Sequence, residues 1–161
     1  NAFVIISDED ISWDQYELDT KWSDHRLIIP VLFDFYHGVE IILKGFLIAA
    51  GKLGTKNHEL SKLLSEFEKY YSNGELHIFF TKYIDIAHLP DLLKDFCKES
   101  SITMDDYYQA LKYPKSNRGN KYFYLPLKYK GKNGVTFFKE LEKDIDDAIN
   151  QIVDLGRSIK P

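Results

Sequence analysis

The longest apolar stretch of the chain covers Val31–Ala50 and is followed, after a short glycine-bearing loop, by an amphipathic segment. On a helix drawn through this stretch, apolar side chains fall on almost every side, which is typical of a buried helix. We therefore expect the helix to be central to the fold. Ser23 or Asp24 is placed to cap its start. Pro30 falls in its first turns or at a kink, and Gly51 is expected to end it.

A few polar side chains interrupt this helix at regular spacing. At about 100° per residue, His37, Glu40 and Lys44 fall within one narrow sector. Glu40 and Lys44 stand in the order that favours an i,i+4 ion pair, so one interpretation is a structural ion pair beside a satisfied core histidine. The alternative is a groove in which these three side chains transfer protons or orient a ligand. Gly38 and Gly45 line an adjacent sector, which predicts that a neighbouring helix passes close.

Helical spacing also dominates the rest of the chain. The further helices expected are Ser12–Trp22, His58–Tyr71, Leu76–His88, Asp91–Lys98, Thr103–Pro114 and Val135–Arg157. The last of these is predicted to bury one face made of Phe138, Leu141, Ile145, Ala148, Ile149, Ile152 and Leu155. The 161 residues should therefore form a single all-α domain, a bundle of five to six helices preceded by an arm at residues 1–11.

The segment at residues 114–133 departs from this pattern and is predicted to be a basic and aromatic insertion. Its sequence KYFYLPLKYKGKNG has extended character, from which we expect a short β-ribbon or a flap near residues 121–130. The basic residues from Lys112 to Lys132, with no acid among them, are Lys112, Lys115, Arg118, Lys121, Lys128, Lys130 and Lys132. The interleaved aromatic residues are Tyr113, Tyr122, Phe123, Tyr124 and Tyr129.

This local excess of positive charge stands out in a chain whose formal net charge is −4. Lysine and arginine neutralise phosphates, and aromatic faces stack on unpaired bases. The ligand contacts expected on this ground are Lys112, Lys115, Arg118, Lys121, Tyr122 and Tyr124. The alternative is a solvated loop whose aromatic side chains pack inward.

Acidic residues concentrate at the other end of the chain. They are Asp8, Glu9, Asp10, Asp14, Glu17, Asp19 and Asp24, against Lys21 alone. The simpler interpretation is a solvated acidic face on the first helix. The alternative is an arm that lies across the basic segment of its own or a second subunit.

Three pieces of the sequence together resemble the HEPN domain family (higher eukaryotes and prokaryotes nucleotide-binding). They are GVEIILKGFLIAAGK with Glu40 and Lys44, the helix start His58-Glu59-Leu60, and YYQALKYP at Tyr107–Pro114. The resemblance covers roughly Asp24 to Pro114, with the C-terminal helix added by topology. It implies a dimerising helical bundle of a prokaryotic defence, toxin–antitoxin or nucleotidyltransferase-associated system, which binds nucleotide, RNA or a partner protein.

The ribonuclease members of that family carry an arginine followed four to six residues later by a histidine. This chain has no such pair, and it shows Lys112-Tyr113-Pro114 where many relatives show Arg-Tyr-Pro. The resemblance therefore implies a non-catalytic homodimer, with a cognate nucleotidyltransferase or a toxin or antitoxin protein as a further partner. Two alternatives stay open. One is a divergent, metal-independent endoribonuclease that uses His37 and Arg118, and the other is a pure protein–protein interaction subunit.

Several other functions are not supported by any pattern in the chain. The single cysteine, Cys97, rules out an internal disulfide and a cysteine-based metal cluster, and we expect it to be buried and inert. There is no HExxH, P-loop or GxGxxG pattern, so we expect neither a metal nor a cofactor. Phe3–Ile6 is too short for a signal sequence, and the polar groups on Val31–Ala50 argue against a membrane span. A cytoplasmic protein is expected.

Overall fold

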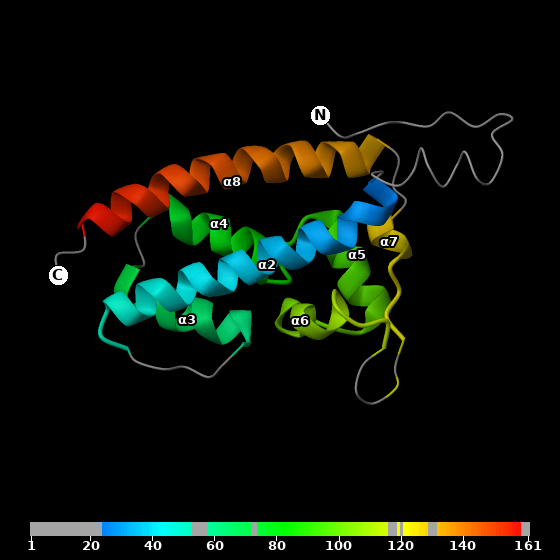
Figure 1. The fold of residues 1–161 in the computed structure, drawn as a ribbon, viewed down its shortest axis with the longest axis horizontal. Helices are drawn as coiled ribbons and strands as arrows, with labels where there is room; N and C mark the ends of the chain where they lie inside the picture. Colours follow the sequence, from blue (N-terminus) through cyan, green and yellow to red (C-terminus); the bar gives the residue numbers. More distant parts are fainter. Residues whose placement is uncertain are drawn as a thin grey trace, which may run out of the picture.

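The computed structural model describes residues 24–52, 58–71, 74–115, 119, 121–128 and 132–158. Within these ranges the chain is an all-α helical bundle, as the spacing predicts (Figure 1). Its helices are α2 (Asp24–Ala49), α3 (Leu60–Tyr71), α4 (Glu75–Ile84), α5 (Asp91–Ser100), the 3₁₀ helix η1 (Met104–Asp106), α6 (Tyr107–Ala110), α7 (Leu125–Lys128) and α8 (Lys132–Ser158). The predicted helix Ser12–Trp22 and the acidic N-terminal segment lie outside the described residues.

Helix α2 corresponds to the long apolar stretch. The side of α2 that faces the core consists of Ile28, Leu32, Tyr36, Val39, Leu43, Phe46 and Leu47. Pro30 lies within α2 near its start and does not end it. The helix ends where Gly51 takes a φ of 76°, a left-handed conformation that glycine adopts without strain. The N–H of Lys52 then donates to the carbonyl of Leu47 at 2.9 Å, which closes the helix in the manner of a Schellman motif.

The outward side of α2 corrects two expectations. A Cβ built on Gly38 or Gly45 would meet nothing within 4 Å, so the prediction of a helix passing close to these glycines is wrong within the described part of the chain. Ile41 and Ile48 are 56% and 57% exposed, so α2 is not enclosed on all sides. Among the described residues, α2 and the other helices are not long and apolar enough to cross a membrane.

Helix α3 packs on α2 and α4, and α4 packs on α8. The Phe67 ring on α3 lies 5.7 Å from Phe46 on α2 and 5.3 Å from Phe80 on α4, centroid to centroid. Helix α8 covers α4, with the Asp144 carboxylate accepting hydrogen bonds from Lys82 at 2.5 Å and from the Tyr83 hydroxyl at 2.8 Å. These contacts join segments that are far apart in the sequence.

The buried face of α8 differs in part from the predicted one. Phe137, Leu141 and Ala148 are buried, whereas Phe138, Ile145, Ile152 and Leu155 are partly buried against the core. Ile149 was expected on the buried face, but it is 52% exposed. The main contacts of α8 among the described helices are with α4 and α5, and Ile149 is not among the α8 residues that pack against the core there.

The segment predicted as a β-ribbon or flap is different in the structure. Among the described residues there is one isolated antiparallel bridge, between Lys115 and Lys121, and no strand. Residues 122–124 have no regular secondary structure, and the next four form the short helix α7. The N–H of Phe123 donates to the Ser100 hydroxyl at 3.0 Å, which ties the segment to the end of α5. The segment therefore packs against the bundle, with Tyr122 and Leu127 buried in the core.

Candidate functional site

Glu40, near the middle of α2, is a buried carboxylate with three side-chain partners. Glu40 is only 3% exposed. Oε1 accepts from Lys44 Nζ at 2.6 Å and lies 2.8 Å from Nδ1 of His58, while Oε2 accepts from the hydroxyl of Tyr107. The expected Glu40–Lys44 ion pair is therefore confirmed, and it forms part of a larger network that joins α2, the start of α3 and α6.

This network holds the carboxylate in its charged form. Burial alone raises the pKa of Glu40, but the hydrogen bonds from Lys44, Tyr107 and His58 outweigh it, so that the net pKa lies below the usual value. Burial, followed by the hydrogen bond to Glu40, raises the pKa of the Tyr107 hydroxyl well above its ordinary value. Tyr107 therefore stays protonated and acts as a donor to Glu40 at physiological pH.

The histidine beside the ion pair is His58, not the expected His37. His37 is exposed, and its ring is stacked on Phe33 at a centroid distance of 6.0 Å and an interplanar angle of 14°. His58, just before α3, has a side chain that is 65% exposed although its Nδ1 contacts Glu40. The prediction of a core histidine at position 37 is wrong, because Glu40 faces the α3 and α6 side of α2 while His37 lies toward solvent.

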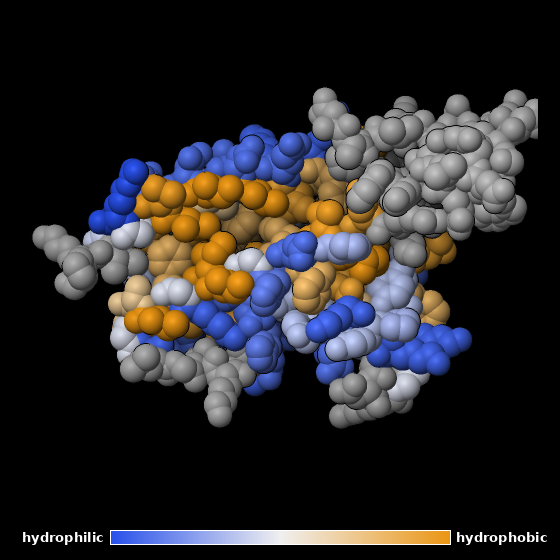
Figure 2. Space-filling model, in the orientation of Figure 1, coloured by the Kyte–Doolittle hydropathy of each residue, from blue (hydrophilic) through white to orange (hydrophobic). Residues whose placement is uncertain are grey.

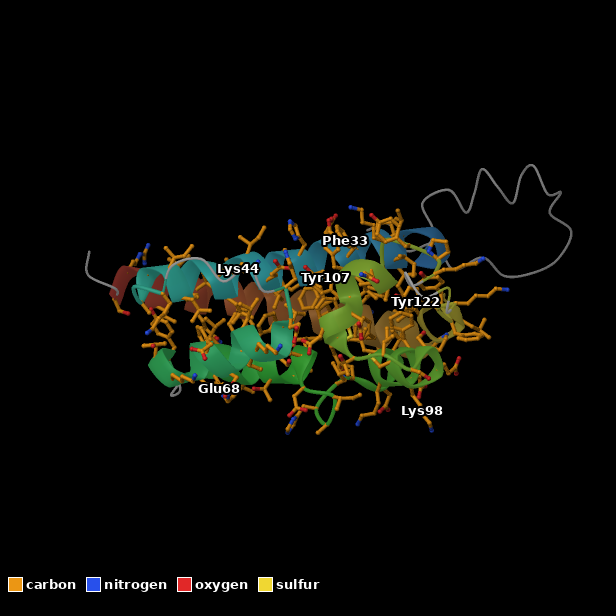
Figure 3. The ribbon with its side chains drawn as sticks, turned by 90° about the horizontal axis from the view of Figure 1, so that it is seen from below. Phe33, Lys44, Glu68, Lys98, Tyr107 and Tyr122 are labelled. Carbon is orange, nitrogen blue, oxygen red and sulfur yellow. The ribbon has the colours of Figure 1, made fainter. Side chains whose placement is uncertain are left out.

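Next to this network, rings from three segments form one partly open surface. The Phe33 ring lies 5.7 Å from Tyr108, and the Tyr108 ring lies 6.1 Å from His58. Lys112 Nζ lies 4.9 Å from the centroid of Tyr108 and 5.5 Å from that of Tyr113, within the range of cation–π contacts. We call this set, Phe33, His37, His58, Tyr108, Lys112 and Tyr113, the aromatic surface. Figure 3 shows Phe33 on α2 next to Tyr107 of α6, with Lys44 further along α2.

The aromatic surface links two features that the sequence analysis kept apart. His37 belongs to the polar sector of α2, and Lys112 begins the basic segment. Phe33 and Tyr108 lie between them in a continuous series of ring contacts. Sequence reasoning did not select Phe33 or Tyr108, because their proximity depends on how α6 docks on α2. Their aromatic character was the one signal available.

The predicted ligand-contact residues of the basic segment differ in their exposure to solvent. Lys112, Lys115 and Lys121 are exposed, and Arg118 lies outside the described residues. Tyr122 is only 8% exposed as a residue, too little for its ring to stack on a base without a rearrangement. Tyr124 stacks on Phe96 at 5.8 Å and donates its hydroxyl to the carbonyls of Ala110 and Tyr113 at 2.6 Å. In this segment the side chains of Tyr113 and Phe123 are exposed instead, at 47% and 54%.

A separate pocket of about 290 Å³ lies between α3 and the turns before α5 and η1. It is lined by Ser61, Leu64, Ser65, Glu68, Ile84, Asp85, Ile86, Thr103, Met104 and Asp105. Each of its carboxylates already has a partner in the protein: Glu68 contacts His77 at 2.7 Å, Asp85 contacts His88, and Asp105 accepts from Ser61. Two of these contacts join α3 to α4 and to η1, so the carboxylates that line the pocket already have structural partners.

Two further expectations concern metals and Cys97. Within the described ranges, no group of three or more histidine, cysteine or carboxylate residues could hold a metal ion. Cys97 is buried, as expected, with its Sγ 3.4 Å from the sulfur of Met104. Burial raises the pKa of its thiol to about 12, so at neutral pH it is a protonated thiol and a poor nucleophile.

Comparisons of the chain with protein-family models, with curated proteins and with solved structures found no match. The resemblance to HEPN domains thus stays a prediction that these comparisons do not support. The class of protein defined by the fold is an all-α helical bundle, and any function must be argued from its own side chains.

Proposed function

We propose that this protein is a binding module that holds single-stranded RNA or a nucleotide on the aromatic surface. The observation that carries the proposal is the continuous series from His37 through Phe33 and Tyr108 to Lys112, because it places ring faces and a lysine cation on one surface. Ring faces stack on unpaired bases, and cations neutralise the phosphates between them.

The exposure and charge of the surface fit this chemistry. Tyr108 is 37% exposed and Tyr113 47%, so each presents part of a ring to solvent. Lys112 is held against both rings, and Lys115 and Lys121 are exposed nearby in sequence. Arg118 is added to the phosphate contacts on the ground of sequence alone. A strand of RNA laid here would stack at the tyrosines and meet positive charge on its backbone.

The proposal is tested by titrating a fluorescent single-stranded RNA and following its anisotropy at low salt. Tyr108→Ala should weaken binding by about 5- to 150-fold, the equivalent of one lost stacking contact of about 1–3 kcal/mol. Lys112→Ala should weaken binding and lower the salt dependence by about 0.7 in log–log slope. Unlabelled mononucleotides added as competitors distinguish a nucleotide site from a polynucleotide site.

Tyr70 provides a matched control. It is 43% exposed, and Lys52 Nζ lies 5.6 Å from its ring centroid, so it reproduces the tyrosine–lysine pair in a different part of the protein. Tyr70→Ala should leave RNA binding unchanged. If Tyr108→Ala and Tyr70→Ala lost the same RNA affinity, or if the unaltered protein bound no RNA, the aromatic surface would be excluded as the RNA-binding site.

A second candidate function, metal-independent endoribonuclease activity, is favoured by the contact between His58 and Glu40. The carboxylate at 2.8 Å from Nδ1 orients the ring, so Nε2 is the nitrogen left to exchange a proton with a substrate. In such a reaction His58 takes the proton of a ribose 2′-hydroxyl, whose oxygen attacks the adjacent phosphorus. The bond to the 5′-oxygen breaks, and His37 supplies the proton to that leaving oxygen.

This reaction leaves a 2′,3′-cyclic phosphate on one fragment and a 5′-hydroxyl on the other, and both ends can be identified by mass spectrometry. His58→Ala and His37→Ala should each abolish cleavage while Tyr70→Ala does not. RNA that binds but stays intact during long incubation would leave the binding module as the better description.

The proposal also includes homodimer formation and a partner protein, such as a cognate nucleotidyltransferase or a toxin or antitoxin protein. Both rest on the resemblance described above. The exposed apolar side chains of α2 and α8 support at least one protein partner, since soluble proteins seldom leave such faces in contact with water.

A further inference from the structure

The ammonium group of Lys112 is shared by two tyrosine rings of the aromatic surface. Its Nζ is 4.9 Å from the ring centroid of Tyr108 and 5.5 Å from that of Tyr113. Both tyrosines are exposed to solvent in part. Two open rings therefore lie next to one positive charge, and this grouping is more specific than a basic surface with scattered aromatic residues.

The ammonium group leaves the face of the Tyr108 ring open. Nζ of Lys112 is 3.2 Å from the Tyr108 hydroxyl oxygen but 4.9 Å from the ring centroid, so it lies at the hydroxyl end of the ring. The neighbouring rings of Phe33 and His58 are tilted against Tyr108 by 52° and 36° and do not stack flat on it. A flat base can therefore lie on the exposed part of this ring.

The backbone at Tyr113 is fixed to the rest of the bundle. Its N–H donates to the carbonyl of Gln109 at 2.9 Å, and its carbonyl accepts from the Tyr124 hydroxyl at 2.6 Å. The carbonyl of the next residue, Pro114, accepts from the N–H of Tyr122 at 3.3 Å. These bonds set the position of Tyr113 relative to α6 before any ligand binds, which lowers the cost of ordering the site on binding.

We infer that the minimal ligand of the aromatic surface is a unit of two consecutive nucleotides in single-stranded RNA, with one base on Tyr108, the next base on Tyr113 and the phosphodiester between them on Lys112. In a single strand, each pair of neighbouring bases is joined by one phosphate with one negative charge, which matches two rings beside one cation. A mononucleotide can fill only one of the two rings. The inference rests on the proposed function and narrows its ligand.

The charges at the two ends of the site give the strand a direction of exit. Beyond Tyr113, Lys115 and Lys121 are exposed and joined by an antiparallel bridge, so their side chains are neighbours that can meet the next phosphate. At the other end, Asp34 is exposed on α2, next to Phe33 in the sequence. A longer strand should therefore continue past Tyr113 and not along α2.

The other carboxylates close to these rings already have partners in the protein. They are Glu40 in the buried network, Glu59, paired with Lys62, and Asp105 and Asp106, which accept hydrogen bonds from Ser61 and Thr103. Figure 2 shows a mostly hydrophilic surface over α6 and the chain that follows it, unlike the apolar band between α2 and α8. This surface suits a ligand that carries charge.

The experiment measures how well unlabelled ApA and AMP displace the fluorescent single-stranded RNA from the full chain. ApA should bind about 5- to 150-fold more tightly than AMP, because it adds one stacked base, although AMP carries the greater charge. Tyr113→Ala should remove this advantage and leave AMP binding nearly unchanged. Phe123→Ala is the matched control, because Phe123 is 54% exposed in the same basic segment but lies outside the aromatic surface. Circular dichroism verifies that both variants are folded.

A dinucleotide whose linking phosphate is replaced by a neutral methylphosphonate tests the role of Lys112. Lys112→Ala should weaken the binding of ApA by about 2- to 5-fold but leave the binding of the neutral dinucleotide unchanged. Lys115→Ala is the control lysine. It should not affect ApA, which has no phosphate beyond its second base, but it should weaken the binding of a longer strand.

The outcomes separate this inference from the proposed function. If AMP competed as well as ApA, or if Tyr113→Ala and Phe123→Ala had equal effects on ApA, the two-nucleotide unit would be overturned, while RNA binding lost in Tyr108→Ala would still support the proposed function. An equal effect of Lys112→Ala on the charged and neutral dinucleotides would overturn the position of the phosphate. If the unaltered protein bound no labelled RNA, the proposed function and this inference would fail together.

Discussion

Replacement of Glu40 is the sharpest test of the buried network between α2, α3 and α6. In Glu40→Ala, the buried Tyr107 hydroxyl loses its acceptor, and Lys44 and His58 lose their common partner. An unsatisfied buried donor costs about 1–3 kcal/mol, and the loss of the partly packed side chain adds about 1 kcal/mol. We therefore expect the free energy of unfolding to fall by about 2–4 kcal/mol. Glu40→Gln keeps an acceptor oxygen but loses the charge, so it should cost about 1–2 kcal/mol.

The pH dependence gives a second, independent readout of the same network. The pKa of Glu40 is lower in the folded protein than in the unfolded chain, so its stabilisation is fully present above the unfolded pKa of about 4.3 and is lost as the pH falls through the folded value. The difference in stability between the unaltered protein and Glu40→Gln should therefore shrink as the pH is lowered below about 4.3.

Urea unfolding followed by circular dichroism measures both effects. Glu66→Ala is the control, because Glu66 forms an exposed i,i+3 pair with Lys69 and its removal should change the free energy of unfolding by less than about 0.5 kcal/mol. The reasoning would be refuted if Glu40→Ala lowered the free energy of unfolding by no more than Glu66→Ala does. If the free energies of unfolding of the unaltered protein and of Glu40→Gln differed by the same amount at pH 7 and at pH 3, the charge of Glu40 would not contribute to stability.

Three further changes have expected outcomes that unfolding experiments can measure. Asp105→Ala removes the carboxylate that accepts from the backbone N–H of Ser61 at 2.7 Å and from its hydroxyl, at the start of α3, and should cost about 0.5–2 kcal/mol, with Asp105→Asn costing less. Tyr83→Phe removes the 2.8 Å hydrogen bond to Asp144 between α4 and α8 and should cost about 0.5–1.5 kcal/mol; no change would mean that this contact is not formed in solution. Gly51→Ala forces a side chain into a φ of 76° after α2 and should cost about 1 kcal/mol, while a stabilised variant would contradict that backbone conformation.

The helical architecture could largely be predicted from the sequence because helix periodicity is a local property. The bounds of α3, α5 and α8 lie within a few residues of the predicted ones, and the i,i+4 pair of Glu40 and Lys44 forms as its spacing indicates. Predictions that depended on contacts between residues far apart in the sequence were less accurate. The extended, aromatic sequence of residues 121–130 predicted a ribbon. In the structure Tyr122 packs into the core and Leu125–Lys128 form α7.

The candidate site shows where local information ends. By itself, the sequence determined that His37, Glu40 and Lys44 share one sector of a long apolar helix, because that follows from a turn of about 3.6 residues. Only the tertiary structure decided which histidine meets Glu40, since His58 is 18 residues away and Tyr107 is 67 residues away along the chain. The docking of α3 and α6 on α2 selects these partners. The same docking brings Tyr108 to Phe33, for which no spacing within one helix could provide a signal.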